Sequence, residues 1–267
     1  MNNEIYNKEN LPLKDLEKIG LATKNNILIN PDDLHALLSG RRTGMIKIHN
    51  LSAENIHIKE LDAKLSLRSI GQGKLELLLH PIYKEAIHPE YLSKVEADQL
   101  EKGAAANVLK TLEDENGRYK DFIIEFDQDT KEFIVTDTEK IRIPDLVNNI
   151  PLTELQKEEF RQGKVVPLDD GTSFTYTGID RQDLRSNKIA LVISILIDGG
   201  LSYLVYQGIM ALHGLKQNNA DSNKLSEGYY KSLKDASEKQ EQKAGLSAGY
   251  GNKNEQSRGY GRSGISR

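Results

Sequence analysis

The sequence predicts an α+β protein built from small helix-and-sheet units. Three observations support this fold class. They are helical spacing within residues 10–40, alternating apolar and polar residues across 45–79, and an internal repeat in the middle of the chain. A chain of 267 residues suits one to two domains. Its apolar content of 37% is low for a fully folded chain, and a polar tail explains part of the deficit.

Residues 1–86 are expected to form a small helix-plus-antiparallel-sheet domain. The segment Leu13–Ile19 carries apolar residues at helical spacing. A second helix is expected after Asn30, because Asn30 can cap it and Pro31 suits its first turn. Beyond this helix, apolar residues alternate with polar ones from Met45 to Leu79, which predicts the strands of the sheet.

The middle of the chain contains an internal repeat whose two copies lie sixty residues apart. In each copy a Ser or Thr follows an apolar residue and can cap a helix, and a glycine ends the helical pattern. The corresponding residues are Leu92, Ser93, Leu100 and Gly103 in the first copy and Leu152, Thr153, Phe160 and Gly163 in the second. A strand and an Asn-Gly or Asp-Gly turn come next in both copies, and these dipeptides are typical of hairpins. We therefore expect two helix/β-hairpin cassettes, at 87–150 and 151–188.

The segment 189–216 contains a long apolar run, Ile189 to Leu212, interrupted by Asp198-Gly199-Gly200. Its 24 positions are enough for a membrane span, which needs about 20. A single span would place Asp198 near the bilayer centre, at a cost of about 2.5–3.5 kcal/mol. The alternatives are two buried helices joined at the Asp-Gly-Gly turn, or an exposed hairpin that joins copies of the chain. We expect an apolar helical hairpin or a membrane segment here.

Residues 217–267 are rich in Gly, Ser, Asn, Gln and Lys and are expected to be a disordered tail. From Lys216 to the end, ten Lys and Arg face six Asp and Glu, so the tail carries about +4. Arg258, Tyr260 and Arg262 lie in a glycine background, where arginine and tyrosine can contact the phosphates and bases of a single strand. A tail that is merely solvated explains the same composition.

A second basic feature follows the second expected helix. Arg41 and Arg42 come directly after it, and Lys47 lies on the next expected strand. Two helices followed by a hairpin would resemble a winged helix that brings these three cations near phosphates. The simpler interpretation is that the two arginines stabilise the negative C-terminal end of the helix.

No catalytic signature accompanies these features. The sequence has no phosphate-binding Gly-x-x-x-x-Gly-Lys loop, no Gly-x-Ser-x-Gly elbow and no His-Glu-x-x-His motif. It contains no cysteine, which excludes disulfides and thiolate metal sites and suits a reducing compartment. No cofactor and no metal site are predicted. The first residues lack a basic region followed by an apolar stretch, so a cleaved signal peptide is not expected.

Several segments resemble a family of domain-of-unknown-function proteins carried on conjugative and mobilisable elements of Gram-negative anaerobic bacteria. They are Leu38–Thr43, Glu96–Gly103, Ile124–Asp127, Pro151–Lys157 and Asp198–Tyr203, and the resemblance extends over about residues 10–216. Related modules are sometimes appended to topoisomerase-like or primase-like proteins, which implies a neighbourhood of DNA handling. The resemblance supplies no catalytic or binding residues.

Together these features predict a non-enzymatic accessory protein of a mobile genetic element that binds nucleic acid or a partner in a transfer complex. The alternative is a membrane-anchored scaffold of a conjugation apparatus. The expected partners are DNA or RNA, proteins of the conjugation machinery, a membrane in contact with 189–212, or further copies of the chain. The expected location is the bacterial cytoplasm, either free or at the inner membrane.

Overall fold

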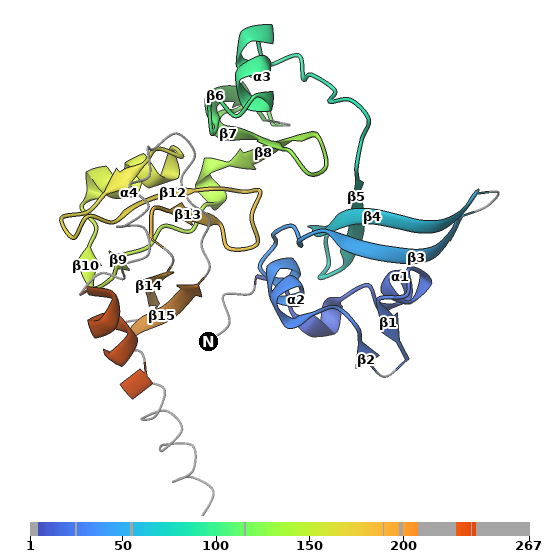
Figure 1. Ribbon diagram of the computed structural model, residues 1–267, viewed down its shortest axis with the longest axis horizontal. Coiled ribbons are helices and arrows are strands. Elements are labelled where there is room, and N and C mark those ends of the chain that lie inside the picture. Colours follow the sequence, from blue (N-terminus) through green and yellow to red (C-terminus); the bar gives the residue numbers. More distant parts are fainter. Residues whose placement is uncertain are drawn as a thin grey trace, which may run out of the picture.

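The computed structural model describes residues 5–24, 26–53, 56–114, 116–188, 190–197, 200–207, 228–235 and 237–238. Within them the chain forms a series of small antiparallel sheets accompanied by short helices (Figure 1). We call residues 5–81 the N-terminal unit and residues 91–207 the repeat unit.

The N-terminal unit packs short helices against a three-stranded sheet. Its elements are η1 (Lys8–Asn10), α1 (Leu13–Lys18), the pair β1 (Ala22–Thr23) and β2 (Asn26–Ile27), α2 (Pro31–Leu38), and the sheet of β3 (Ile46–Ala53), β4 (Ile56–Ser69) and β5 (Leu75–Pro81). The Asn30 side chain accepts a hydrogen bond from the Asp33 amide, so α2 begins at the predicted residue. Leu16, Leu37, Ile48 and Leu65 form the fully buried centre of this unit.

The two predicted cassettes have the same local order of elements. The first contains α3 (Lys94–Glu101), β6 (Val108–Glu113), β7 (Tyr119–Asp127) and β8 (Glu132–Asp137); the second contains α4 (Glu154–Arg161), β11 (Val166–Pro167), β12 (Ser173–Tyr176) and β13 (Leu184–Ser186). Both sheets are antiparallel and follow the chain order. The glycines after the helices, Gly103 and Gly163, both have positive φ, at 66° and 70°. Left-handed backbone of this kind ends a helix and favours glycine.

The remaining sheet joins the segment between the two helices α3 and α4, just before α4, to the C-terminal end of the repeat unit. Its strands lie in the order β10 (Ile150–Pro151), β9 (Leu146–Val147), β14 (Ala190–Ile197) and β15 (Gly200–Gln207). The 3-10 turn η2 (Thr138–Lys140) precedes this sheet along the chain. Apolar residues of α4, of the second cassette and of β14 share one core that includes Phe160, Phe174 and Leu191.

The prediction of a helical hairpin over 189–212 is wrong, and the predicted fold class, which included it, is wrong as well. The run forms the antiparallel β14–β15 hairpin, in which Val192 pairs with Val205. Leu191, Val192 and Ile193 are all at most 4% exposed, so β14 is buried on both faces. A strand of that kind has a continuous apolar sequence that periodicity cannot distinguish from a helix, and its β-branched residues favour the extended backbone.

No helix among the described residues is long and apolar enough to cross a membrane, so the expected membrane span is not present there. Asp198 and Gly199 lie outside the described residues, and Gly200 begins β15.

One segment of the tail that was predicted to be disordered is helical. Residues 228–235 and 237–238 are helical, and Tyr229 is 3% exposed in a small cluster with Ala190 and Val192 of β14. The Asn149 side chain also donates a hydrogen bond to Asp235 at 2.8 Å. This segment therefore packs against the repeat unit through contacts that composition alone does not reveal.

Candidate binding cleft

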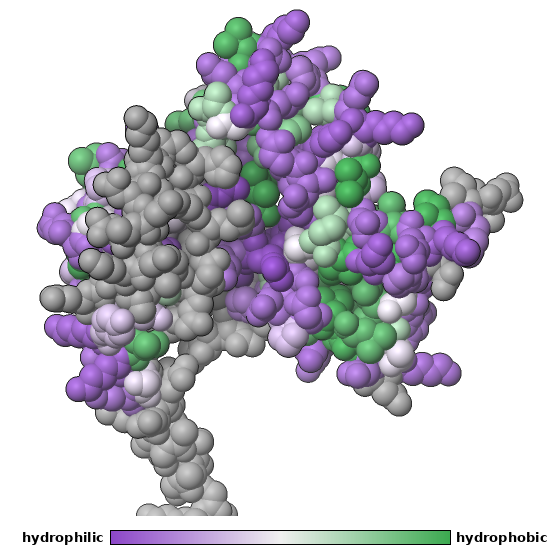
Figure 2. Space-filling view, viewed as in Figure 1, coloured by the Kyte–Doolittle hydropathy of each residue, from purple (hydrophilic) through white to green (hydrophobic). Residues whose placement is uncertain are grey.

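A cleft of about 870 Å³ lies where the N-terminal unit meets the two cassettes. Its wall on the N-terminal side contains residues 39–42 and 66–67, and its other walls come from β6–β8, η2 and the β12–β13 loop. Six cationic side chains line it: Arg41, Arg42, Arg118, Lys120, Lys140 and Arg142. Four carboxylates line it as well: Glu113, Asp114, Asp137 and Asp183. Figure 2 shows hydrophilic side chains gathered along this boundary between the two units.

The turn after α2 places the two predicted arginines in the cleft. Gly40 has a φ of 74°, and the Arg41 amide donates to the Ala36 carbonyl at 2.8 Å, so the chain reverses tightly at the end of the helix. Two hydrogen bonds then attach Thr43 to Leu65 of β4, one from the Thr43 amide and one to its hydroxyl. Arg41 and Arg42 are thereby held between α2 and the sheet, facing the repeat unit.

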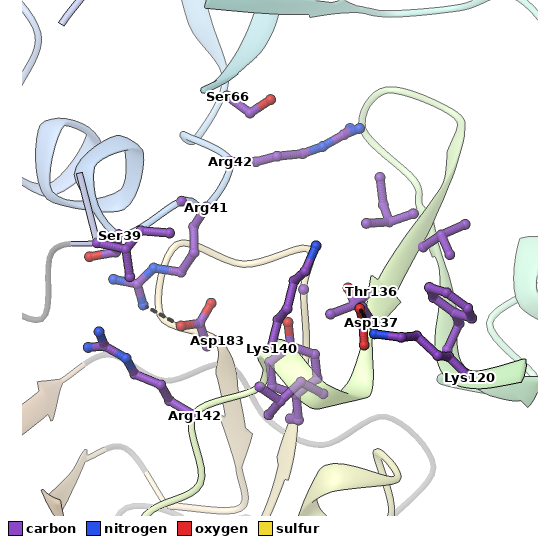
Figure 3. Close-up of a pocket in the computed structure, with 18 of the residues that line it drawn as sticks. Ser39, Arg41, Arg42, Ser66, Lys120, Thr136, Asp137, Lys140, Arg142 and Asp183 are labelled. Carbon is purple, nitrogen blue, oxygen red and sulfur yellow. Dashed lines mark hydrogen bonds and ion pairs between the residues drawn. The ribbon is translucent and has the colours of Figure 1, made fainter. Parts of the chain in front are cut away.

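Arg41 forms an ion pair with Asp183 across the cleft. Its Nη1 lies 3.0 Å from Asp183 Oδ2, and the arginine side chain is only 6% exposed (Figure 3). Burial raises the pKa of the Asp183 carboxyl to about 6, although the charge of Arg41 acts in the opposite direction. The Nε atom of Arg41 is buried without a hydrogen-bond partner. The guanidinium is therefore only partly satisfied by the contacts it makes here.

Arg42 and Lys64 bind carboxylates at the turn between β7 and β8. Arg42 Nη1 lies 2.7 Å from Glu132 Oε2, and Lys64 Nζ lies 2.9 Å from both oxygens of Asp127. Burial favours the neutral form of Glu132, but hydrogen bonds from His80 and Arg42 and the charge of Arg42 outweigh it and lower its pKa to about 2. Glu132 is therefore held as an anion by cations of the N-terminal unit.

The cations on the opposite wall differ in their pairing. Lys120 contacts Asp137 and Glu139, and Arg118 contacts Asp114 of its own turn. Lys140 is exposed and has neither a hydrogen-bond nor an ion-pair partner among the described residues. Figure 3 shows its side chain extending into the space between Arg41 and Lys120, with Arg142 beside Asp183. Lys140 is the cation of the cleft best placed to meet an external anion.

A buried carboxyl lies directly behind this wall. Glu125 is 2% exposed and accepts hydrogen bonds from the Thr177 hydroxyl at 2.7 Å and the Gly178 amide at 2.6 Å. Burial raises its pKa to about 7, and burial also raises the pKa of the nearby Tyr176 hydroxyl. A Cβ added at Gly178 would lie 2.7 Å from Thr136 Oγ1, so glycine allows this close packing. Because Glu125 is enclosed, its titration affects the stability of the wall rather than a ligand directly.

The structure brings together only part of the site predicted from sequence. Arg41 and Arg42 both line the cleft, whereas Lys47 lies on β3 and contacts Glu60 at 3.7 Å and Asp62 at 3.6 Å. Arg258, Tyr260 and Arg262 lie outside the described residues. No group of three or more potential metal ligands occurs in the described part of the chain.

Sequence reasoning missed Lys140, Arg142 and Asp183. The first two stand two residues apart before a proline, which in extended chain places them on the same side. That spacing is a weak signal that could have been noticed. Asp183 has a φ of 55° in a loop, and no pattern in the sequence marks it.

Residues 6–90 match the family model described as Protein of unknown function (DUF4099). The match covers nearly all of the N-terminal unit and the linker up to residue 90, so that part of the chain is similar to a family whose function is unknown. No curated protein and no solved structure matches the chain.

Proposed function

We propose that this protein is a non-enzymatic binding protein that holds single-stranded nucleic acid in the cleft through its phosphate backbone. The observation that carries the proposal is the surplus of six cationic over four acidic side chains in the cleft, with Lys140 unpaired among the described residues. The whole chain has a net charge of −4, so this local surplus is opposite in sign to the rest of the molecule. Cations concentrated in a cleft attract phosphates and release their counterions on binding.

The shape of the site favours a single strand over a duplex. Duplex sequence is read by an element that protrudes into a groove, whereas this site is hollow. Tyr6 and Phe122 lie among the lining residues and are only partly buried. Aromatic side chains beside a basic groove allow the bases of a single strand to stack while the cations bind its phosphates.

The biological setting is part of the same proposal. The resemblance to proteins of conjugative and mobilisable elements supports an accessory role in the cytoplasm of a bacterium that carries such an element. The matched family has no assigned activity and so does not select among DNA-handling roles.

Fluorescence anisotropy with labelled single- and double-stranded DNA and RNA, at several salt concentrations, tests the binding. We expect single strands to bind more tightly than duplex. The double variant K140E/R142E should weaken binding at least about tenfold, and the slope of log affinity against log salt should fall by about one for each phosphate that the variant no longer neutralises.

Two control variants make this test specific. K102E changes the same kind of charge just after α3, where Lys102 is 74% exposed, and should leave binding nearly unchanged. K47E tests the surface predicted from sequence. If K47E and K140E/R142E weaken binding equally, or if binding is insensitive to salt, the cleft is not the binding site.

A second candidate function is docking of a partner protein of the transfer machinery, and one observation favours it. Val95 and Leu155 occupy the same position in α3 and α4, two residues after the capping residue, and are 67% and 69% exposed. A photo-crosslinking amino acid at each position, expressed in the host, should then capture the same protein. The same substitution at Leu109, 38% exposed on β6, serves as the control and should not capture it.

A further inference from the structure

Three cations of the N-terminal unit are each covered by a carboxylate of the repeat unit. The pairs are Arg41 with Asp183 at 3.0 Å, Arg42 with Glu132 at 2.7 Å and Lys64 with Asp127 at 2.9 Å. A carboxylate oxygen at these distances occupies the place that a phosphate oxygen takes in a charge-assisted hydrogen bond. In one further pair the charges are reversed, because Arg181 of the repeat unit contacts Asp33 of the N-terminal unit at 3.3 Å.

The boundary between the two units is polar. Among the described residues, the apolar core of the N-terminal unit ends at Leu79 along the chain. The two larger apolar clusters that follow begin at Ala86, so none of these three clusters includes residues of both units. The linker between the units exposes Ile82 by 52% and Ile87 by 83%. Two units joined by a polar interface can change their relative position without breaking an apolar core.

Arg41 gives a second indication, because one of its hydrogen-bond donors has no partner while the two units are in contact. Its side chain is 6% exposed, and its Nε atom has no hydrogen-bond partner. A buried donor without a partner costs roughly 1–3 kcal/mol. A phosphate can accept from Nε and from a terminal nitrogen of the same guanidinium at once, which would remove this cost.

We infer that Arg41, Arg42 and Lys64 form a second binding surface for the phosphates of single-stranded nucleic acid, which carboxylates of the repeat unit cover until a strand enters the cleft. The inference rests on the proposed binding in the cleft and adds its regulation. A strand first meets Lys140 and Arg142, and its further phosphates then compete with Asp183 and Glu132 for the two arginines. A ligand that binds the open arrangement more tightly shifts the population towards it.

The first experiment measures the distance between the units directly. The chain contains no cysteine, so the double variant K18C/K102C can carry two spin labels at side chains that are 73% and 74% exposed. Lys18 is the last residue of α1 and Lys102 follows α3 directly, so one position lies in each unit (Figure 1). We expect the distance distribution to shift when a saturating single-stranded oligonucleotide is added. An unchanged distribution at saturation overturns the inference.

The second experiment removes one covering carboxylate. E132Q should tighten oligonucleotide binding about fivefold or more, because it removes the nearer of the two carboxylates that contact Arg42 and leaves only Asp127 at 3.7 Å. D98N removes the same charge from the exposed surface of α3 and controls for net charge. Adding R42Q to E132Q should abolish the gain, because the released arginine is then missing. Equal affinities of E132Q and D98N overturn the inference.

Failure of the inference can be told apart from failure of the proposed function. If oligonucleotides bind wild-type protein but neither the label distance nor the E132Q affinity responds, the cleft binds nucleic acid and the covering carboxylates have only a structural role. If oligonucleotides do not bind, inorganic polyphosphate is the probe. If polyphosphate shifts the label distance and binds E132Q more tightly than wild type, the three cations are a covered phosphate-binding surface. Nucleic acid is then excluded as the ligand of that surface.

Discussion

Lys64 and Asp127 form an enclosed ion pair between strand β4 and the end of strand β7. The lysine Nζ lies 2.9 Å from each carboxylate oxygen, and the two side chains are 5% and 1% exposed. Asp127 also receives a hydrogen bond from the Asp129 amide at 3.1 Å, which fixes the turn that carries it. The pair is one of the contacts that hold the first cassette against the N-terminal unit.

Removing one partner of this pair should be strongly destabilising. K64M leaves the buried Asp127 with Arg42, at the longer distance of 3.7 Å, as its remaining cationic partner, and we expect a loss of about 3–5 kcal/mol in the free energy of unfolding. K47M is the matched control, because Lys47 is 52% exposed and its removal should cost about 0–1 kcal/mol. Urea denaturation followed by circular dichroism measures both. Similar losses for the two variants would contradict this account.

Glu125 should make stability decrease as the pH rises towards neutrality. Its pKa is about 7 in the folded protein against an ordinary value of 4.5, so folding favours the protonated form. That contribution is complete below about pH 4.5 and is lost as the pH rises through about 7. Asp183, with a pKa of about 6, acts in the same direction. Below pH 4.5 the sign reverses, because the lowered pKa of Glu132 makes its protonation destabilising.

The variant E125Q isolates this effect. Its amide can accept from Gly178 and donate to the Thr177 hydroxyl, and it carries no charge to desolvate. We expect E125Q to be more stable than wild type at pH 8 by on the order of 2 kcal/mol, and the difference to shrink at pH 5. Thermal or urea denaturation between pH 4 and 8 measures it. A pH dependence identical to that of wild type would show that Glu125 stays ionised in the fold.

Alanine substitutions at Gly163 and Gly171 should distinguish the cost of backbone strain from the cost of steric crowding. Both have positive φ, at 70° and 75°. A Cβ at Gly163 would lie 2.8 Å from Asn107 Nδ2 and 3.0 Å from Ile123 Cδ1, whereas one at Gly171 would meet nothing within 4 Å. G171A should therefore cost about 1–2 kcal/mol from the backbone alone, and G163A should cost more. Equal losses in urea denaturation would mean that Asn107 and Ile123 adjust without cost.

The two capping boxes should contribute equally to the stability of the protein. The Ser93 hydroxyl accepts from the Glu96 amide at 3.3 Å, and the Thr153 hydroxyl accepts from the Gln156 amide at 3.2 Å. S93A and T153A should each lower the free energy of unfolding by about 1 kcal/mol. L155A removes an exposed side chain from the same helix and should change stability by less than about 0.5 kcal/mol. An effect at only one cap would show that the two cassettes are not energetically equivalent.

Local chemistry made several boundaries predictable. Asn30, Ser93 and Thr153 cap helices because their short side chains reach the free amides of the first turn. Gly103 and Gly163 end two of those helices because the left-handed backbone there is strained for other residues. These effects act over a few residues, so they can be read from sequence without knowledge of the fold.

The candidate site was predictable only in part, because its groups are far apart in the chain. The basic pair Arg41 and Arg42 stands out in the sequence, but its partners Asp183 and Glu132 lie 142 and 90 residues away. Whether a cation faces solvent, a phosphate or a carboxylate depends on which surfaces meet. The same holds for Glu125, whose raised pKa comes from burial among residues of two cassettes.

The sequence by itself determined the helix ends, the repeated order of helix, glycine and hairpin, and the concentration of apolar residues at 189–212. The tertiary structure alone decided that this apolar run is a strand pair and that Tyr229 packs on it. It also decided that the two arginines face carboxylates across a cleft. Caps and turns follow from short-range hydrogen bonding and allowed φ values, whereas burial on both faces and charge pairing follow from contacts between distant segments.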